Sequence, residues 1–268
     1  PILKNFLLFT EPGYICLTAT DLQLIITCKI AGVTSGLMDE RVLIPGAVAD
    51  LVASLPQDKI ELDIQMDKMT VSCRRTSARF NLPPSQNYPP IPTVDSTPIE
   101  IKGADLREAA ELVLLAVSED QSRPVLSGVC LKQSEGHLVM VGGDGFRLAE
   151  SNLLVPSSDN FCVVIPAYSL REVVRNLSPV DIVKISSQGN RVKFQIANLT
   201  FISQLIVEPF PKYEQLFFDK YVTKAVVSSE DFKAAIKSIL SLKSASESTK
   251  VVVETSKIQF STKSEVGE

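Results

Sequence analysis

The chain has 268 residues, of which 45% are hydrophobic and 22% are charged, and it carries a formal net charge of −4. This composition excludes a collagen-like or disordered chain, and the length is sufficient for two or more domains that need no disulfide bonds. No apolar run reaches the roughly eighteen residues of a membrane span, and we expect no secretory leader. We therefore expect a cytoplasmic protein that does not contact membranes.

The elements predicted in the first part of the chain begin with two apolar segments within residues 1–21, on either side of a turn at Gly13. The stretch VLIPGAVADLVASLP (42–56) predicts a strand followed by a helix. In KIELDIQ (59–65), apolar and acidic residues alternate, which indicates a strand with one buried face.

The next part of the chain contains two segments with the apolar spacing of amphipathic helices. The first stripe consists of Leu106, Ala109, Ala110, Val113 and Val117. The second consists of Leu170, Val173, Val174 and Leu177. The segment RVKFQIA (191–197) alternates Val192, Phe194 and Ile196 with polar residues and predicts another half-buried strand.

An internal repeat organises these elements. PILKNFLLFTEPGYICLTATD (1–21) aligns without a gap to PVLSGVCLKQSEGHLVMVGGD (124–144), at an offset of 144 − 21 = 123 residues. The matched pairs include Leu3 and Leu126, Gly13 and Gly136, and Asp21 and Asp144. The alignment continues further along the chain. Pro45 matches Pro166 at an offset of 121 residues, and Tyr88 matches Tyr213 at an offset of 125 residues.

A third copy begins late in the chain, because SSEDFKAAIKSIL (228–240) parallels KGADLREAAELVL (102–114). We predict three domains, at residues 1–98, 99–221 and 222–268. By the repeat length, the first domain lacks its N-terminal part and the third is partial, so we expect the sequence to be a fragment.

The cysteines and the histidine do not show the spacing or number that a metal site, a set of disulfide bonds or a catalytic triad requires. The five cysteines form no CxxC spacing, and four of them lie in apolar segments that predict small core residues: Cys16, Cys73, Cys130 and Cys162. The single histidine, His137, is expected at a surface hairpin turn. Phosphate-loop, zinc-protease and serine-hydrolase motifs are absent, so we expect no catalytic residue, no metal and no cofactor.

Basic residues recur on one face of two predicted helices. Arg171 and Arg175 are four residues apart, as are Lys233 and Lys237. Each pair alone could simply solvate a surface, but repetition would add the stripes into a positive surface that contacts phosphates without reading bases. The helix predicted within 46–56 carries only Asp50 and adds nothing to this surface.

The stretch VGGDG (141–145) resembles the phosphate-binding GGDG turn of diacylglycerol-kinase-like enzymes, in which glycines let backbone amides approach phosphate. That family has Thr after the turn, where this chain has Phe146, and the first copy has TATDLQ with no glycine. A corner of the repeated unit accounts for both differences.

Three motifs carry a more specific resemblance: RPVLSGV (123–129), DGFRLA (144–149) and FPKYEQL (210–216). They resemble, in order and spacing, the RPVLNG, DGHRLA and FPDY signatures of the bacterial DNA polymerase III beta subunit, the sliding clamp. LTATDLQLIIT (17–27) is similar to the corresponding region of that family's first domain. The resemblance implies an α+β fold of repeated clamp domains, each with two helices that line an inner face and antiparallel sheets outside.

The resemblance also implies a hydrophobic pocket between the second and third domains that takes the tail peptides of partner proteins. Carried over by motif, its residues are Leu126, Gly143, Gly145, Phe146, Arg147, Leu148, Pro211, Gln215 and Leu216. Phe146 replaces the usual His, Gly143 a common Thr, and Gln215 a residue that is often basic. We therefore expect partner peptides to differ in the residues that flank their apolar anchors.

The function implied is a non-catalytic processivity factor that encircles duplex DNA, with Arg123, Arg171, Arg175, Lys233 and Lys237 facing the DNA. Its partners would be the polymerase III alpha subunit, the clamp loader and other proteins with clamp-binding motifs, and the full-length chain would form a homodimeric ring. Two alternatives remain open at this point. One is a lipid-kinase-like enzyme that uses the GGDG turn, and the other is a β-rich repeat scaffold that binds only proteins.

Overall fold

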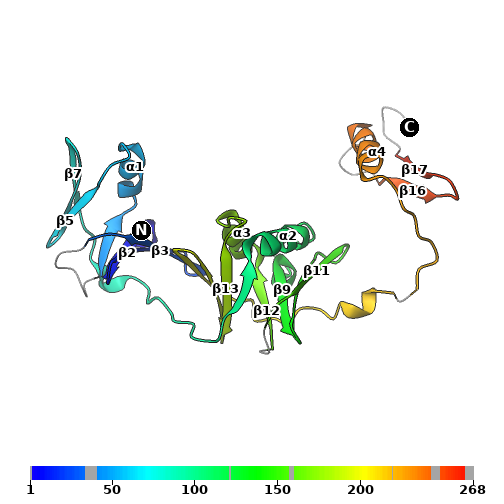
Figure 1. Ribbon diagram of the computed structural model, residues 1–268, viewed down its shortest axis with the longest axis horizontal. Coiled ribbons are helices and arrows are strands. Elements are labelled where there is room, and N and C mark those ends of the chain that lie inside the picture. Colours follow the sequence, from blue (N-terminus) through cyan, green and yellow to red (C-terminus); the bar gives the residue numbers. More distant parts are fainter. Residues whose placement is uncertain are drawn as a thin grey trace. The chain divides into compact units, whose positions relative to one another are not determined.

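The computed structural model describes residues 2–33, 41–120, 122–156, 160–218, 220–242 and 248–262. The chain forms two compact units, residues 1–211 and 212–268. The first unit contains two copies of the repeated module (Figure 1). Within the described residues, no helix is both long and apolar enough to cross a membrane.

The described residues of the first module form seven strands, one helix and two short 3-10 helices. In chain order these are η1 (Ile2–Lys4), β1 (Asn5–Glu11), β2 (Tyr14–Thr20), β3 (Leu24–Ala31), β4 (Val42–Pro45), α1 (Ala47–Ser54), β5 (Glu61–Gln65), β6 (Lys68–Cys73), β7 (Thr76–Asn81) and η2 (Ser85–Asn87).

The second module repeats this order and adds a strand and a helix before it. Its elements are β8 (Ile99–Lys102), α2 (Gly103–Leu114), η3 (Pro124–Ser127), β9 (Gly128–Ser134), β10 (His137–Gly143), β11 (Leu148–Leu154), β12 (Phe161–Pro166), α3 (Ala167–Arg175), β13 (Ile182–Gln188), β14 (Arg191–Ile196) and β15 (Leu199–Gln204).

The residues that coincide in the two copies have the same structural role. Gly13 and Gly136 turn the first hairpin of each module with φ of 79° and 80°, a backbone conformation that favours glycine. Asp21 and Asp144 each follow the second strand, and each accepts backbone N–H groups two and three residues ahead. The repeat read from the sequence is therefore a repeat of structure.

The two modules share one antiparallel sheet of eight strands, in the order β4-β1-β2-β3-β15-β14-β13-β8. Strand β3 of the first module pairs with β15 of the second, from Leu24 opposite Ser203 to Cys28 opposite Leu199. Strands β11-β10-β9-β12 form a second sheet, and β5-β6-β7 a third. The β3–β15 pairing is thus the joint that fuses the modules.

Side chains reinforce this joint. The Tyr168 hydroxyl donates a hydrogen bond to the Asp21 carboxylate, and Asn198 donates to the carbonyl oxygen of Lys29 at 3.1 Å. Burial and the neighbouring Asp21 carboxylate raise the pKa of Tyr168, so the phenol keeps its proton across the neutral range. Burial alone would raise the pKa of Asp21, but the hydrogen bonds from Tyr168 and from backbone amides outweigh it and lower that pKa.

Helices α2 and α3 lie against each other and cover the four-stranded sheet of the second module (Figure 1). Their predicted apolar stripes are buried in one core that also contains Val192, Phe194 and Ile196 of β14, which confirms those sequence predictions. Leu24 of β3 belongs to the same core. The mixture of helices and antiparallel sheets confirms the α+β class. The second module has two helices, while the described residues of the first form one.

The second unit contains η4 (Glu214–Leu216), α4 (Ser229–Leu242), β16 (Lys250–Val253) and β17 (Ile258–Ser261). Strands β16 and β17 form an antiparallel hairpin. The ring of Phe232 in α4 packs edge-on against that of Phe260, with 5.3 Å between the centroids. The helix predicted from the third copy is therefore present and packs on the hairpin that follows it.

The prediction for Cys162 was wrong. Cys16, Cys73 and Cys130 are buried as expected, but Cys162 is exposed. It lies on the edge strand β12, and side chains alternate between the two faces of a strand. Ile165 faces the core beneath the helices, so Cys162 faces the opposite side, where its Sγ lies 3.8 Å from that of Cys130.

Gly142 offers a test of the packing between α2 and β10. A Cβ atom at this position would lie 2.3 Å from the backbone carbonyl oxygen of Val113, which cannot move without distorting the helix. We expect Gly142→Ala to lower the free energy of unfolding by about 1–3 kcal/mol, as overpacking of a core does. Urea denaturation measures this loss.

Gly32→Ala is the matched control, because its nearest obstacle is the flexible end of the Ile15 side chain. If Gly142→Ala lowered the free energy of unfolding by no more than Gly32→Ala does, the proposed contact between residue 142 and the Val113 carbonyl would be contradicted.

Candidate functional site

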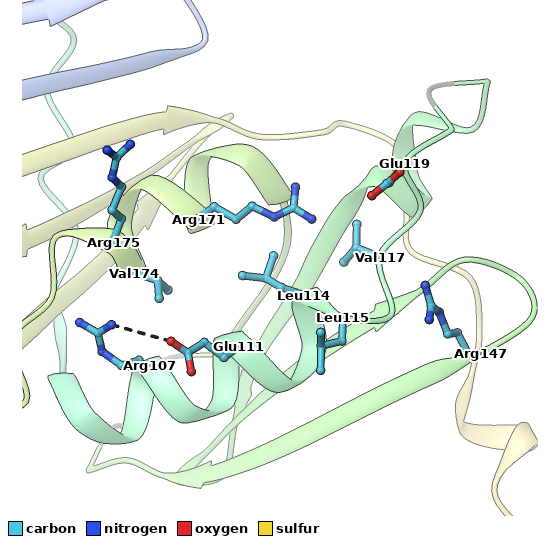
Figure 2. Close-up of a pocket in the computed structure, with 10 residues that line it drawn as sticks. All are labelled: Arg107, Glu111, Leu114, Leu115, Val117, Glu119, Arg147, Arg171, Val174 and Arg175. Carbon is cyan, nitrogen blue, oxygen red and sulfur yellow. Dashed lines mark ion pairs between the residues drawn. The ribbon is translucent and has the colours of Figure 1, made fainter. Parts of the chain in front are cut away.

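An open groove of about 550 Å³ runs between α2 and α3 in the second module (Figure 2). Its apolar floor consists of Leu114, Leu115, Val117 and Val174. Its charged residues are Arg107, Glu111, Glu119, Arg147, Arg171 and Arg175. Four guanidinium groups and two carboxylates therefore surround an apolar floor, which gives the groove a positive balance in a chain whose total charge is negative.

Of the four arginines of the groove, Arg147 forms a close ion pair with Asp144 at 3.0 Å, whereas the other three are only weakly neutralised. Arg107 lies 3.7 Å from Glu111 on the same helix, and Arg175 lies 3.9 Å from Glu172. Exposed ion pairs of this kind contribute little to the stability of the fold, and salt screens them. Arg171 is exposed and forms no ion pair with any residue that the structure describes. Figure 2 shows its side chain extending along the groove, opposite Val117.

The sequence-predicted pair Arg171 and Arg175 thus lies in α3, at the rim of a groove that sequence reasoning did not foresee. Arg107 was missed because it is the only basic residue within α2, whereas the prediction required two at helical spacing. Its proximity to α3 was the missing information: the Arg107 guanidinium donates to the backbone carbonyl oxygen of Leu177, just beyond that helix.

Arg123, the remaining cation predicted in the second domain, lies elsewhere. It directly precedes η3, and its Nη1 atom is 4.0 Å from where a Cβ on Gly145 would be. Arg123 is therefore next to the loop 144–147, which we call the corner loop, and does not line the groove. Lys233 and Lys237 are exposed in α4 of the second unit.

Asp144 closes the corner loop on itself. Its Oδ1 accepts hydrogen bonds from the backbone N–H groups of Phe146 and Arg147, both at 2.9 Å, and its Oδ2 accepts one from Arg147 Nε at 3.0 Å. These bonds, the Phe146 amide first, lower the pKa of the Asp144 carboxyl. The amides that a phosphate-binding turn would offer to a ligand are thus occupied by the loop's own aspartate, which argues against a nucleotide site here.

Several residues of the predicted peptide pocket meet at this corner. Gly143 pairs with Leu148 across β10 and β11, and a Cβ on Gly143 would lie 3.6 Å from Leu148 Cδ1. Gly145 has a φ of 90°, which favours glycine. The Phe146 side chain is 99% exposed. An apolar ring held in solvent at a tight loop is available to a partner.

The other predicted pocket residues are distributed over both units. Leu126 is buried in η3, and Pro211 is the exposed last residue of the first unit. Gln215 and Leu216 lie in η4 of the second unit, where Leu216 is 59% exposed. Because the two units are described separately, the joining of these residues into one pocket stays a prediction.

No group of three or more potential metal-binding side chains occurs in the part of the chain that the structure describes.

Two family models match the chain. The N-terminal domain of the DNA polymerase III beta subunit matches residues 1–95, and the central domain of the same subunit matches residues 100–212. Together they cover most of the chain, and the boundary between them falls in the segment that connects β7 to β8.

Individual proteins agree with this assignment. The beta sliding clamp of Pseudomonas aeruginosa is 28% identical over 81% of this chain, which spans 60% of that protein's length. A crystal structure of the DNA polymerase sliding clamp from Bacillus subtilis superposes with a TM-score of 0.91 at 22% identity, over 100% of this chain and 74% of the other. The Pseudomonas aeruginosa clamp bound to griselimycin gives a TM-score of 0.85 at 22% identity, over 98% and 76%.

The corner loop generates a prediction of pH dependence. The pKa of Asp144 is lower in the folded chain than in the unfolded chain. The ionised carboxylate therefore stabilises the fold above the unfolded-state pKa, and this stabilisation is lost as the pH falls through the folded-state pKa. We expect the carboxyl carbon of Asp144 to titrate, by NMR, at a lower pH in the folded chain than in the urea-unfolded chain. Equal midpoints in the two states would contradict the hydrogen-bonding scheme of the loop.

Proposed function

Because the chain belongs to the DNA polymerase III beta subunit family, we propose that it works as a sliding clamp, a non-catalytic ring that holds the replicative polymerase on duplex DNA. The observation that carries this proposal is the β3–β15 joint, by which one module adds its sheet edge to the next. The chain spans about 60% of the length of the Pseudomonas aeruginosa relative. The proposal that the protein closes into a ring therefore applies to a chain with three complete modules.

The open sheet edges support a ring. Among the described strands, β11 pairs only with β10, and β7 pairs only with β6. Strand β11 holds the place in the second module that β3 holds in the first, and β7 corresponds to β15. Repeating the observed joint would therefore pair β11 with a third module, and β7 with the third module of a second copy. Such head-to-tail pairing closes a ring when the rotation permits, and it gives β11 and β7 a partner along their open edges.

The groove supports contact with DNA. Arginines on exposed helical faces suit phosphate oxygens, and contacts with the backbone alone carry no sequence information. Weak contacts of this kind permit sliding, while a closed ring would keep the protein on the duplex. We assign Arg171, Arg175 and Arg107 to this surface, with Arg123, Lys233 and Lys237 as further DNA-facing residues in the complete assembly.

The corner loop supports a peptide site of the family type. We propose that Leu126, Gly143, Phe146 and Leu148, with the other predicted pocket residues, bind tail peptides of the polymerase III alpha subunit, the clamp loader and other proteins with clamp-binding motifs. A related clamp has been crystallised bound to griselimycin, which agrees with a ligand site on this fold. The lipid-kinase alternative is disfavoured, because Asp144 occupies the loop amides. A scaffold that binds only proteins would not need the positive groove.

Topology tests the clamp function. A version of the chain with three complete modules should remain on nicked circular plasmid DNA after loading by a clamp loader, because a closed ring cannot leave a circle. Cutting the plasmid once should release it, since the ring then slides off an end. Gel filtration of the protein–plasmid mixture before and after cutting measures retention. Equal retention on circular and linear DNA would contradict the proposal.

A further inference from the structure

A second, smaller hollow of about 170 Å³ lies at the joint between the modules, within the first unit. Its walls come from the first module's corner after β2, from the prolines that follow η2, and from β14 and β15 of the second module. It is thus built where two modules meet, and every residue that forms it is described.

The repeat relates this hollow to the proposed peptide pocket. At the offset of 123 residues, Gly143, Gly145, Phe146 and Leu148 correspond to Thr20, Leu22, Gln23 and Ile25, and at the offset of 125 residues Gln215 corresponds to Pro90. All five counterparts line the hollow. Five of the nine positions predicted for the pocket therefore recur, one module earlier, around an actual cavity.

Leu22 marks the mouth of the hollow. It is 59% exposed and has a φ of 79°, in the left-handed region that its counterpart Gly145 also adopts at 90°. Glycine adopts this conformation freely, whereas a leucine there is strained. A large apolar side chain is thus held beside the hollow at a backbone position where it is disfavoured, which points to a use outside the core.

The size and charge of the hollow define its occupant. Its volume lies below the 300–1,000 Å³ range that is typical of small-molecule sites, and is suited to one apolar side chain of a larger partner. Arg191 is the one charged residue among those that line it, and it forms no ion pair within the described part of the chain. A guanidinium at the edge of an apolar hollow complements a carboxylate next to an apolar anchor.

We propose that this hollow is a second peptide site, which takes a leucine-sized side chain of a short acidic segment of a partner protein and pairs the adjacent carboxylate with Arg191. This second site goes beyond the proposed clamp function. It rests on that function in one respect, namely that the corner of a module binds peptides. A full clamp would then offer two peptide sites per chain with different charge preferences.

Photo-crosslinking of the 268-residue chain tests the proposal. The probe is the peptide acetyl-Ser-Asp-photoleucine-Ser-amide, and mass spectrometry locates the cross-links. We expect cross-links within residues 20–25 or 89–92. The variant R191Q should lower their yield about two- to fivefold, as the loss of a partly exposed ion pair does. A probe with Asn in place of Asp should be insensitive to R191Q.

The variant L22N should also lower the yield, and asparagine tolerates the left-handed backbone at this position. M66N is the matched control, because Met66 is likewise exposed at a turn with positive φ but lies outside the hollow, and it should leave the yield unchanged. L148D should remove cross-links at the corner loop and leave those at the hollow.

Cross-links confined to residues 126–148, or yields at the hollow that are unaffected by both R191Q and L22N, would overturn the second site. Neither result bears on retention on circular DNA, so a failure here is distinguishable from a failure of the clamp function.

Discussion

The pairing of β3 with β15 is the interaction on which the rest of the structure depends. An edge strand presents unpaired N–H and C=O groups that must find partners, and here the edge of one module satisfies the edge of the next. The pairing carries Leu24 into the core of the second module. Hydrogen bonds from Tyr168 and Asn198 hold the same joint from the side. Two copies of a module thus become one sheet with a fixed register.

The joint also explains where the functional features lie. The corner that precedes β3 is brought against the end of β15, so a hollow forms between modules rather than within one. In the second module, α2 and α3 pack on the sheet with their apolar stripes and leave their arginines in the groove between them. A chain with a net charge of −4 can therefore present a positive surface on its helices and an apolar, weakly charged surface at its corners.

Much of this could be predicted from local patterns. The apolar stripes of α2 and α3 follow from helical spacing, and the shared Asp21 and Asp144 follow from the internal alignment. Features that depend on which elements become neighbours could not be predicted. Arg107 joins the groove only because α2 packs beside α3, and Cys162 is exposed because it lies on the edge strand β12 with its side chain on the face opposite the helices. The hollow at the joint requires β15 and β3 to meet although they are far apart in the sequence: the paired residues Leu199 and Cys28 are separated by 199 − 28 = 171 positions.

Amide hydrogen exchange along β11 tests the central claim, that one edge-to-edge joint is used repeatedly, most directly. In the 268-residue chain, the β11 amides that point away from β10 should exchange rapidly, because this edge has no partner among the described strands. In a version with a complete third module, the same amides should become protected to the degree seen for the outward amides of β3, which already pair with β15. Rapid exchange along β11 in both versions would contradict the account.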